Sequence, residues 1–176
     1  GLWLRKGRVF TIEAAPQKSD RHEVQYSIRL DDDGTAHVTK CRTSYGPVFE
    51  AQKRKFAEMP PEEFSRYHQE TLAGLSQSAQ RDGDLTPTFD QYPGVETFSA
   101  TVPNLAVVDG DYFYFSLLDG IANLLGLRAD KRTNPLYWAS ERSYRVITDI
   151  TFPPSFTLPV LRPEDVSWDV PEGGRV

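Results

Sequence analysis

A strict alternation of apolar and polar side chains over residues 22–30 constrains the fold of this chain more than any other feature. Every second residue in this stretch is apolar, namely Val24, Tyr26, Ile28 and Leu30. This period of two places one face of a β-strand on a hydrophobic core. The turn sequence Asp31-Asp32-Asp33-Gly34 follows, and Asp and Gly tolerate the left-handed backbone angles of tight turns. Residues 35–43 return as a second strand, so the pattern predicts a β-hairpin.

The second half of the chain carries further strand patterns. Residues 95–102 have the pattern of a strand, and residues 143–152 alternate in the same way. Between them, residues 106–108 pair with residues 112–117 across the turn Asp109-Gly110-Asp111, because an Asp-Gly pair between apolar runs is a strong hairpin signal. Shorter strands are predicted at residues 8–15, 157–161 and 166–170.

A helical period interrupts these strands. Apolar residues spaced three and four apart predict a short amphipathic helix that ends at Pro60-Pro61. The same prolines suit the start of a second helix, whose first turn Glu62 and Glu63 stabilise through the helix dipole. An apolar stripe continues along this helix, and a polar turn at residues 81–84 follows it. We therefore expect a helical insertion, broken in two, over residues 47–80.

The composition of this 176-residue chain fits a single β-rich domain. Aromatic residues make up 12% of it, and such side chains favour the pleated, half-buried surface of a strand. Its 13 prolines and 12 glycines are typical of short strands joined by many turns. We expect a mainly β fold over residues 1–176, an antiparallel β-sandwich of immunoglobulin-like outline that carries the helical insertion.

The net charge of −5 disfavours nucleic acid as a partner, because an acidic chain lacks the positive field that phosphate backbones require. Cys41 is the single cysteine and excludes an internal disulfide. No apolar run approaches the roughly 20 residues of a membrane span. The first residues also lack the pattern of a signal peptide, so any export signal is expected upstream of this chain.

No set of residues in the sequence forms a recognisable active site. His37 lies four positions before Cys41 on the same predicted strand, and a separation of about 13 Å is too long for direct proton transfer. We expect Cys41 to be buried and inert. The chain has three histidines, His22, His37 and His68. Their spacing is not that of metal ligands. We therefore expect neither catalytic residues nor a cofactor.

The acidic turn at residues 31–34 superficially resembles a calcium-binding loop. It lacks the alternating ligands and the closing glutamate of the helical calcium site, so an ordinary acidic β-turn is favoured. A weak surface calcium site is the alternative. An enzyme with an unrecognised site is a further alternative, and it would require a concave pocket around His37, His68 or the turn.

Two aromatic clusters are candidates for a binding surface. They are Tyr112-Phe113-Tyr114-Phe115 and Tyr137-Trp138. Aromatic faces pack against the apolar faces of sugars, but successive strand residues point to opposite sides. One set in the first cluster is therefore expected in the core, and the other can form a ladder of tyrosines on the second face. The candidate binding residues are Tyr112, Tyr114, Tyr137 and Trp138.

Three stretches of the chain form a pattern when they are taken together. The first runs from the turn at residues 32–34 into Ser44-Tyr45-Gly46 and a helix that carries Arg54. The second is Arg132-Thr133-Asn134-Pro135-Leu136. The third is the strand over residues 141–153, which leads to Phe156-Thr157-Leu158-Pro159. In this order the stretches resemble the carboxy-terminal domain of unknown function in bacterial transglutaminase-like proteins, and the resemblance covers most of the chain.

The resemblance implies a place in a larger protein. Such proteins have an amino-terminal β domain, a central papain-like Cys-His-Asp domain and this β-rich tail, and they look like exported or envelope-associated proteins. Residues 1–16 would then be the junction from the upstream catalytic domain, and the tail can extend past Val176. Because Cys41 lies in a predicted strand, no catalytic residue of the family carries over to this chain.

The expected function follows from that resemblance. This chain would be a non-catalytic accessory domain that orients or helps to select substrate for its neighbouring catalytic domain, in the periplasm or cell envelope. The alternative is an independent binding module for envelope polysaccharide or protein that uses exposed aromatic residues. Burial or exposure of the candidate tyrosines discriminates between core packing and a binding surface.

Overall fold

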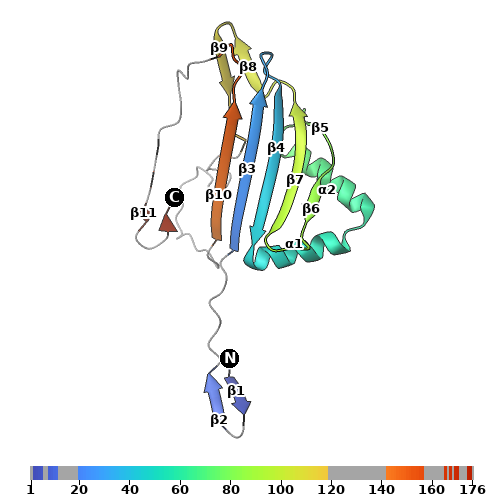
Figure 1. Ribbon diagram of the computed structural model, residues 1–176, viewed down its shortest axis with the longest axis vertical. Helices are drawn as coiled ribbons and strands as arrows, with labels where there is room; N and C mark the ends of the chain where they lie inside the picture. The colour runs from blue at the N-terminus through green and yellow to red at the C-terminus, as the bar shows by residue number, and fades with distance from the viewer. Residues whose placement is uncertain are drawn as a thin grey trace, which may run out of the picture.

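A six-stranded mixed sheet forms the centre of the molecule in the computed structural model, which describes residues 2–5, 8–11, 20–118, 142–156, 165, 167, 169–170 and 174–175. Its long strands are β3 (Asp20–Leu30), β4 (Ala36–Tyr45), β7 (Gly94–Val102) and β10 (Arg142–Thr151). The short strands β5 (Gln80–Arg81) and β6 (Thr86–Thr88) both pair with β7. The order across the sheet is β10-β3-β4-β7-β5 (Figure 1).

Three two-stranded ribbons complete the strands of the described residues. They are β1 (Leu2–Arg5) with β2 (Arg8–Thr11), β8 (Ala106–Asp109) with β9 (Tyr112–Phe115), and β11 (Asp169–Val170) with β12 (Gly174–Arg175). The hairpins predicted at residues 22–43 and 106–117 are both confirmed. The strand predicted at residues 157–161 lies outside the described residues. Of the strand predicted at residues 166–170, Asp169 and Val170 are in β11, and residues 166 and 168 lie outside the described residues.

Two helices form the predicted insertion and pack on one face of the sheet. The helices are α1 (Gly46–Glu58) and α2 (Pro61–Ala73), so the helical insertion is confirmed. Proline has no backbone N–H and restricts the residue before it to extended angles, and Met59 and Pro60 are both extended. Pro61 then lies in the first turn of α2, where an unpaired N–H is normal.

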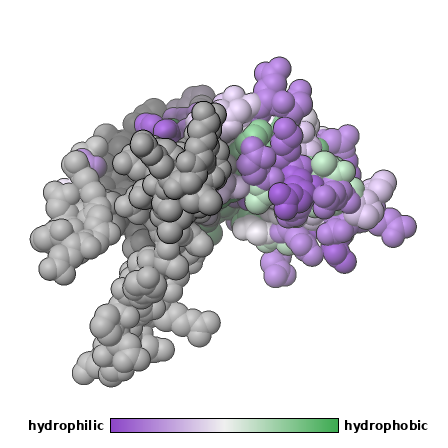
Figure 2. All heavy atoms as spheres, turned by 90° about the horizontal axis from the view of Figure 1, so that it is seen from below, coloured by the Kyte–Doolittle hydropathy of each residue, from purple (hydrophilic) through white to green (hydrophobic). Residues whose placement is uncertain are grey.

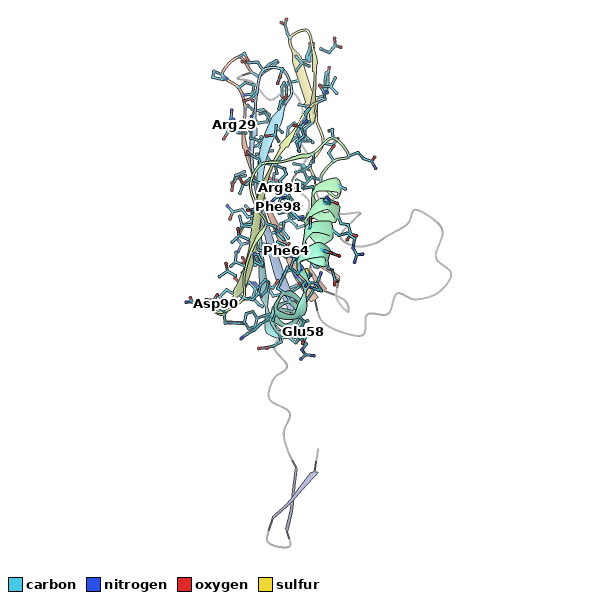
Figure 3. All side chains as sticks on the ribbon, turned by 90° about the vertical axis from the view of Figure 1, so that its right-hand side faces the viewer. Arg29, Glu58, Phe64, Arg81, Asp90 and Phe98 are labelled. Atoms are coloured by element: carbon cyan, nitrogen blue, oxygen red, sulfur yellow. The ribbon has the colours of Figure 1, made fainter. Side chains whose placement is uncertain are left out.

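The hydrophobic core lies between the helices and the inner face of the sheet. Figure 3, which views the sheet edge-on, shows Phe64 of α2 and Phe98 of β7 on this inner side and Arg29 on the opposite side. The core residues buried on the inner face of the six-stranded sheet are Val24, Tyr26, Ile28, Leu30, Ala36, Val38, Phe98, Ala100 and Val102. The alternation predicted for β3 is therefore confirmed, with exposed polar residues on its outer face.

The mainly β class is confirmed, but the immunoglobulin-like sandwich is not. Helices, rather than a second sheet, cover the inner face in the described part of the chain. The period of two shows which residues share a face, and it carries no information about what covers that face. The sheet is also mixed rather than wholly antiparallel, because β10 pairs with β3 in parallel (Figure 1).

A close contact between the β3–β4 turn and the first residue of β8 fixes the β8–β9 hairpin at one end of the sheet. The N–H of Ala106 donates to the carbonyl oxygen of Gly34 at 3.0 Å. Gly34 has a φ of +85°, and a Cβ atom there would lie 2.2 Å from the carbonyl oxygen of Ala106. Only glycine suits both the backbone angle and this approach. The acidic turn between β3 and β4 therefore contacts the β8–β9 hairpin and holds it in position.

Candidate binding surface

The β8–β9 hairpin has two chemically different faces. Its register pairs Val107 with Tyr114 and Asp109 with Tyr112 across the two strands. Directly paired residues share a face in an antiparallel ribbon, so these four side chains lie together on what we call the outer face. The residues of the opposite, inner face are Ala106, Val108, Phe113 and Phe115.

The inner face packs against the segment that follows β10. The rings of Phe113 and Phe156 have centroids 4.9 Å apart, and Phe115 lies edge-on to Phe152 at 5.8 Å. Ala106 is buried. One aromatic set of the Tyr-Phe-Tyr-Phe segment thus joins the apolar packing, as the strand alternation predicts. This packing holds the hairpin in place and leaves the other set free of the core.

The outer face exposes two tyrosine rings. Tyr112 and Tyr114 are each 55% exposed, and Val107 beside them is 61% exposed. The two rings are 6.1 Å apart between centroids and 28° from parallel. Within the described part of the chain, neither phenol group takes part in a hydrogen bond. The outer face therefore offers two flat amphipathic rings next to an aliphatic side chain.

Tyr137 and Trp138, the other two candidate residues, lie outside the described residues. The structure instead adds Val107 and Asp109 to the candidate surface, and the sequence analysis missed both. The sequence could have predicted them, because a two-residue turn at Gly110-Asp111 fixes the register of the hairpin. This register places Val107 opposite Tyr114. The candidate surface is therefore the outer face of the β8–β9 hairpin.

A second polar group lies inside the molecule, between α2 and the sheet. Arg42 of β4 pairs with the carboxylate of Glu96 on β7 and donates to the hydroxyl oxygen of Tyr67 at 2.8 Å. Tyr67 donates in turn to Glu96 at 2.9 Å. Glu96 is only 3% exposed, so its charge depends on these two partners. We call this set the inner polar network.

Electrostatics within the inner polar network favour the paired, charged state. Burial alone would lower the pKa of Arg42, but its interactions with Glu96 and Tyr67 together more than offset burial, and the pKa lies above its ordinary value. Burial raises the pKa of Tyr67, so its hydroxyl keeps its proton and can donate to Glu96. The ammonium group of Lys55 lies 3.9 Å from the centroid of the Tyr67 ring. The network links both helices to the sheet.

The residues proposed for an unrecognised enzyme site lie on different faces. His37 is on the outer face of the sheet, where its Nε2 lies 2.8 Å from Asp31. Cys41 lies on the same face and is partly exposed, so the prediction of a buried cysteine is wrong. The strand alternates, and Cys41 falls three residues after the buried Val38. His68 instead lies on α2 and faces the core.

The acidic turn uses its carboxylates within the protein. Asp31 accepts a hydrogen bond from Arg29 at 2.5 Å, in addition to its contact with His37. Asp33 accepts from the backbone N–H of Thr35 at 2.9 Å, the side-chain bond of an Asx turn. Backbone and side-chain hydrogen bonds from Thr35 lower the pKa of Asp33. Among the described residues, no group of acidic, histidine or cysteine side chains has the arrangement of a metal site.

Comparisons with known proteins add no relative. The chain matches no protein-family model, no curated protein and no solved structure. Among the described helices, none is long and apolar enough to cross a membrane.

Proposed function

We propose that this chain is a non-catalytic accessory domain of a larger bacterial transglutaminase-like or protease-like protein, and that it orients or helps to select substrate. The observation that carries the proposal is the exposed, stacked pair Tyr112 and Tyr114 on a hairpin anchored to the sheet. Tyrosine supplies a large contact area at low cost in conformational entropy, and it is enriched at protein interfaces. The outer face is suited to contact a second molecule.

The position of the hairpin supports a role in presenting that surface. The hairpin stands at one end of the sheet, beyond the turn between β3 and β4 (Figure 1). At the other end, where α1 lies, the described surface is mostly hydrophilic (Figure 2). A rigid base with an aromatic tip places a contact surface at a fixed distance from the rest of the polypeptide. The parent protein, in this proposal, is periplasmic or envelope-associated and carries an upstream catalytic domain.

The first test is to determine the coding sequence that precedes Leu2 in the native gene. We expect a signal peptide and a Cys-His-Asp domain. A coding sequence with neither would overturn the accessory role, and a binding screen on the chain itself would then take its place.

The second test uses the intact protein. Replacing Tyr112 and Tyr114 by serine should raise KM for its substrate about tenfold and leave kcat unchanged, because the surface is proposed to act in binding alone. Ser27→Ala, on the outer face of β3, is the control and should change neither constant. A loss confined to kcat would argue against a substrate-selecting surface.

An independent binding module for envelope polysaccharide is the second candidate function. Its specific support is the exposure of two near-parallel tyrosine rings, because an exposed aromatic face can pack against the apolar face of a sugar. Titration of the chain with soluble peptidoglycan and cellulose fragments, followed by tyrosine NMR signals, tests it. Shifts confined to Tyr112 and Tyr114 support the module, and an unchanged spectrum at millimolar ligand rejects it.

A further inference from the structure

The hairpin with the tyrosine pair carries negative charge and no positive charge. From residue 82 to residue 127 the sequence contains no lysine or arginine. Within this stretch, Asp109 and Asp111 flank Gly110 at the tip of the hairpin, and both are exposed. Asp109 is also paired across the strands with Tyr112, so its carboxylate lies beside the first ring. The outer face is therefore acidic as well as aromatic.

Elsewhere in the molecule, tyrosine rings hold cations. Lys40 lies over Tyr26 at 4.9 Å, Arg21 over Tyr45 at 4.8 Å and Lys55 over Tyr67 at 3.9 Å from the ring centroids. The face of an aromatic ring attracts a cation because its quadrupole is negative there. Tyr112 and Tyr114 have no such cation from the described part of the chain. As far as the described residues are concerned, a cation from another molecule can lie over these rings.

We propose that the outer face binds an extended polypeptide segment that carries arginine or lysine at alternate positions. This inference rests on the proposed function and names the class of partner for the same surface. Each cationic group would lie over a tyrosine ring, and the carboxylates of Asp109 and Asp111 would neutralise its charge. Arginine is favoured over lysine, because a guanidinium plane stacks on an aromatic ring and binds a carboxylate through two hydrogen bonds.

The spacing of the two rings matches that of an extended chain. The ring centroids of Tyr112 and Tyr114 are 6.1 Å apart. Alternate side chains of a β-strand lie on one side at intervals of about 6.5 Å. An Arg-x-Arg segment running along β9 thus brings one cation to each ring. Neutral sugars lack the positive charge that the two aspartates would complement, so the observations favour a cationic peptide.

The test is a titration of the whole chain with two peptides that differ only in charge. The first alternates arginine with threonine over eight residues, and the second has citrulline in place of each arginine. Citrulline keeps the planar shape and removes the charge. We expect the citrulline peptide to bind about tenfold more weakly, and the arginine peptide to lose about fivefold in affinity between about 0.02 M and 0.2 M salt.

Variants of the protein locate the binding. D109N together with D111N, and separately Y112L together with Y114L, should each weaken binding of the arginine peptide about fivefold or more. D90N is the matched control, because Asp90 is exposed at the far end of the sheet from the hairpin (Figure 3) and its loss should leave affinity unchanged. Circular dichroism checks that the folds of the exposed-site variants are intact.

The outcomes separate this inference from the function on which it rests. Equal affinity for the two peptides, or binding that survives the tyrosine substitutions, overturns the cationic partner. If a neutral glycan binds in a tyrosine-dependent way instead, the cationic partner is again wrong while the tyrosine surface as a binding site stands. If no peptide or glycan binds and KM of the intact protein does not respond to the tyrosine substitutions, both proposals fail.

Discussion

Tyr67 and Tyr112 place the same side chain in opposite surroundings. Tyr67 lies between α2 and the sheet, with a cation over its ring and its hydroxyl bonded to Arg42 and Glu96. Tyr112 stands on the outer face of the hairpin, more than half exposed, with another tyrosine beside it. The inner polar network has its charges balanced within the fold, whereas the hairpin leaves negative charge and aromatic surface open. Stability is therefore expected to depend on the first region, and recognition on the second.

The sharpest way to break the inner polar network is Glu96→Ala. The side chain of Arg42 is 28% exposed, and removing the carboxylate leaves its charge without this partner. We expect the free energy of unfolding to fall by about 3 kcal/mol or more, as it does when one partner of a buried ion pair is removed. Urea denaturation measures it.

The double variant Arg42→Met with Glu96→Leu provides the control for that experiment. Because it removes both charges and fills the space with apolar atoms, it should lose less stability than Glu96→Ala alone. A double variant that is less stable than the single one would show that charge pairing is not what the network contributes. The exposed Glu50→Ala should change stability by less than about 0.5 kcal/mol.

Gly34→Ala tests the contact that holds the hairpin. The new Cβ would need a left-handed backbone angle and would meet the carbonyl oxygen of Ala106 at 2.2 Å. We expect a loss of about 3 kcal/mol, the sum of the strain and the forced shift of the hairpin. Gly110→Ala is the matched control, because Gly110 also has a positive φ but has open space around it. Its cost should be about 1 kcal/mol, and equal losses at the two sites would contradict the contact.

The same substitution at the two tyrosines measures the difference between the regions directly. Tyr67→Phe removes a hydroxyl that bonds to two charged groups, and such bonds contribute about 1.5 kcal/mol. Tyr112→Phe removes a hydroxyl that is exposed to solvent, so its effect on unfolding should be close to zero. Thermal denaturation of both variants compares them. Equal shifts in Tm would show that the two hydroxyl groups contribute equally to stability.

A change of pH should act on the interior through His68. Burial, reinforced by the positive charge of Arg81, lowers the pKa of His68 in the folded chain. The unfolded chain therefore binds more protons below its own histidine pKa of about 6.5, and stability falls as pH decreases through that value. Above it this contribution is fully present. The slope cannot exceed about 1.4 kcal/mol per pH unit for one group.

Chemical denaturation at a series of pH values checks the contribution of His68. His68→Gln should flatten the dependence between about pH 5 and 7, since glutamine does not titrate. His37→Gln, which alters a histidine on the outer face beside Asp31, should leave the His68 contribution in place. An unchanged pH profile in His68→Gln would show that another group is responsible.

Local patterns in the sequence predict much of this fold. The β3–β4 hairpin follows from an eleven-residue strand and an Asp-Gly turn, both of which act over neighbouring residues. The split of Phe113 and Tyr112 onto opposite faces follows from the pleat alone. The helix break at Pro60 follows from the missing N–H of proline. Each of these features is decided by residues within a few positions of one another.

Features that depend on distant residues were not predictable. Arg42, Tyr67 and Glu96 come from three elements, and only the register between β4 and β7 brings Arg42 opposite Glu96. The helical stripe allows either Tyr67 or His68 to face the sheet, so spacing alone did not identify the network. The covering of the inner face by helices also depends on tertiary packing. Cys41 is different, because counting from the buried Val38 already places it on the outer face.

The parallel pairing of β10 with β3 has a consequence for how the chain acquires its structure. Arg142 lies opposite Asp20, so β3, the first strand of the six-stranded sheet along the chain, pairs with β10, the last strand of that sheet. Closing so long a loop slows folding, because the chain loses conformational entropy before the contacts between β3 and β10 stabilise it. Before β10 has been synthesised, the edge of β3 is unpaired. This edge can then pair with β10 of another copy of the chain. Domain swapping through β10 is thus the assembly error to which this topology is most exposed.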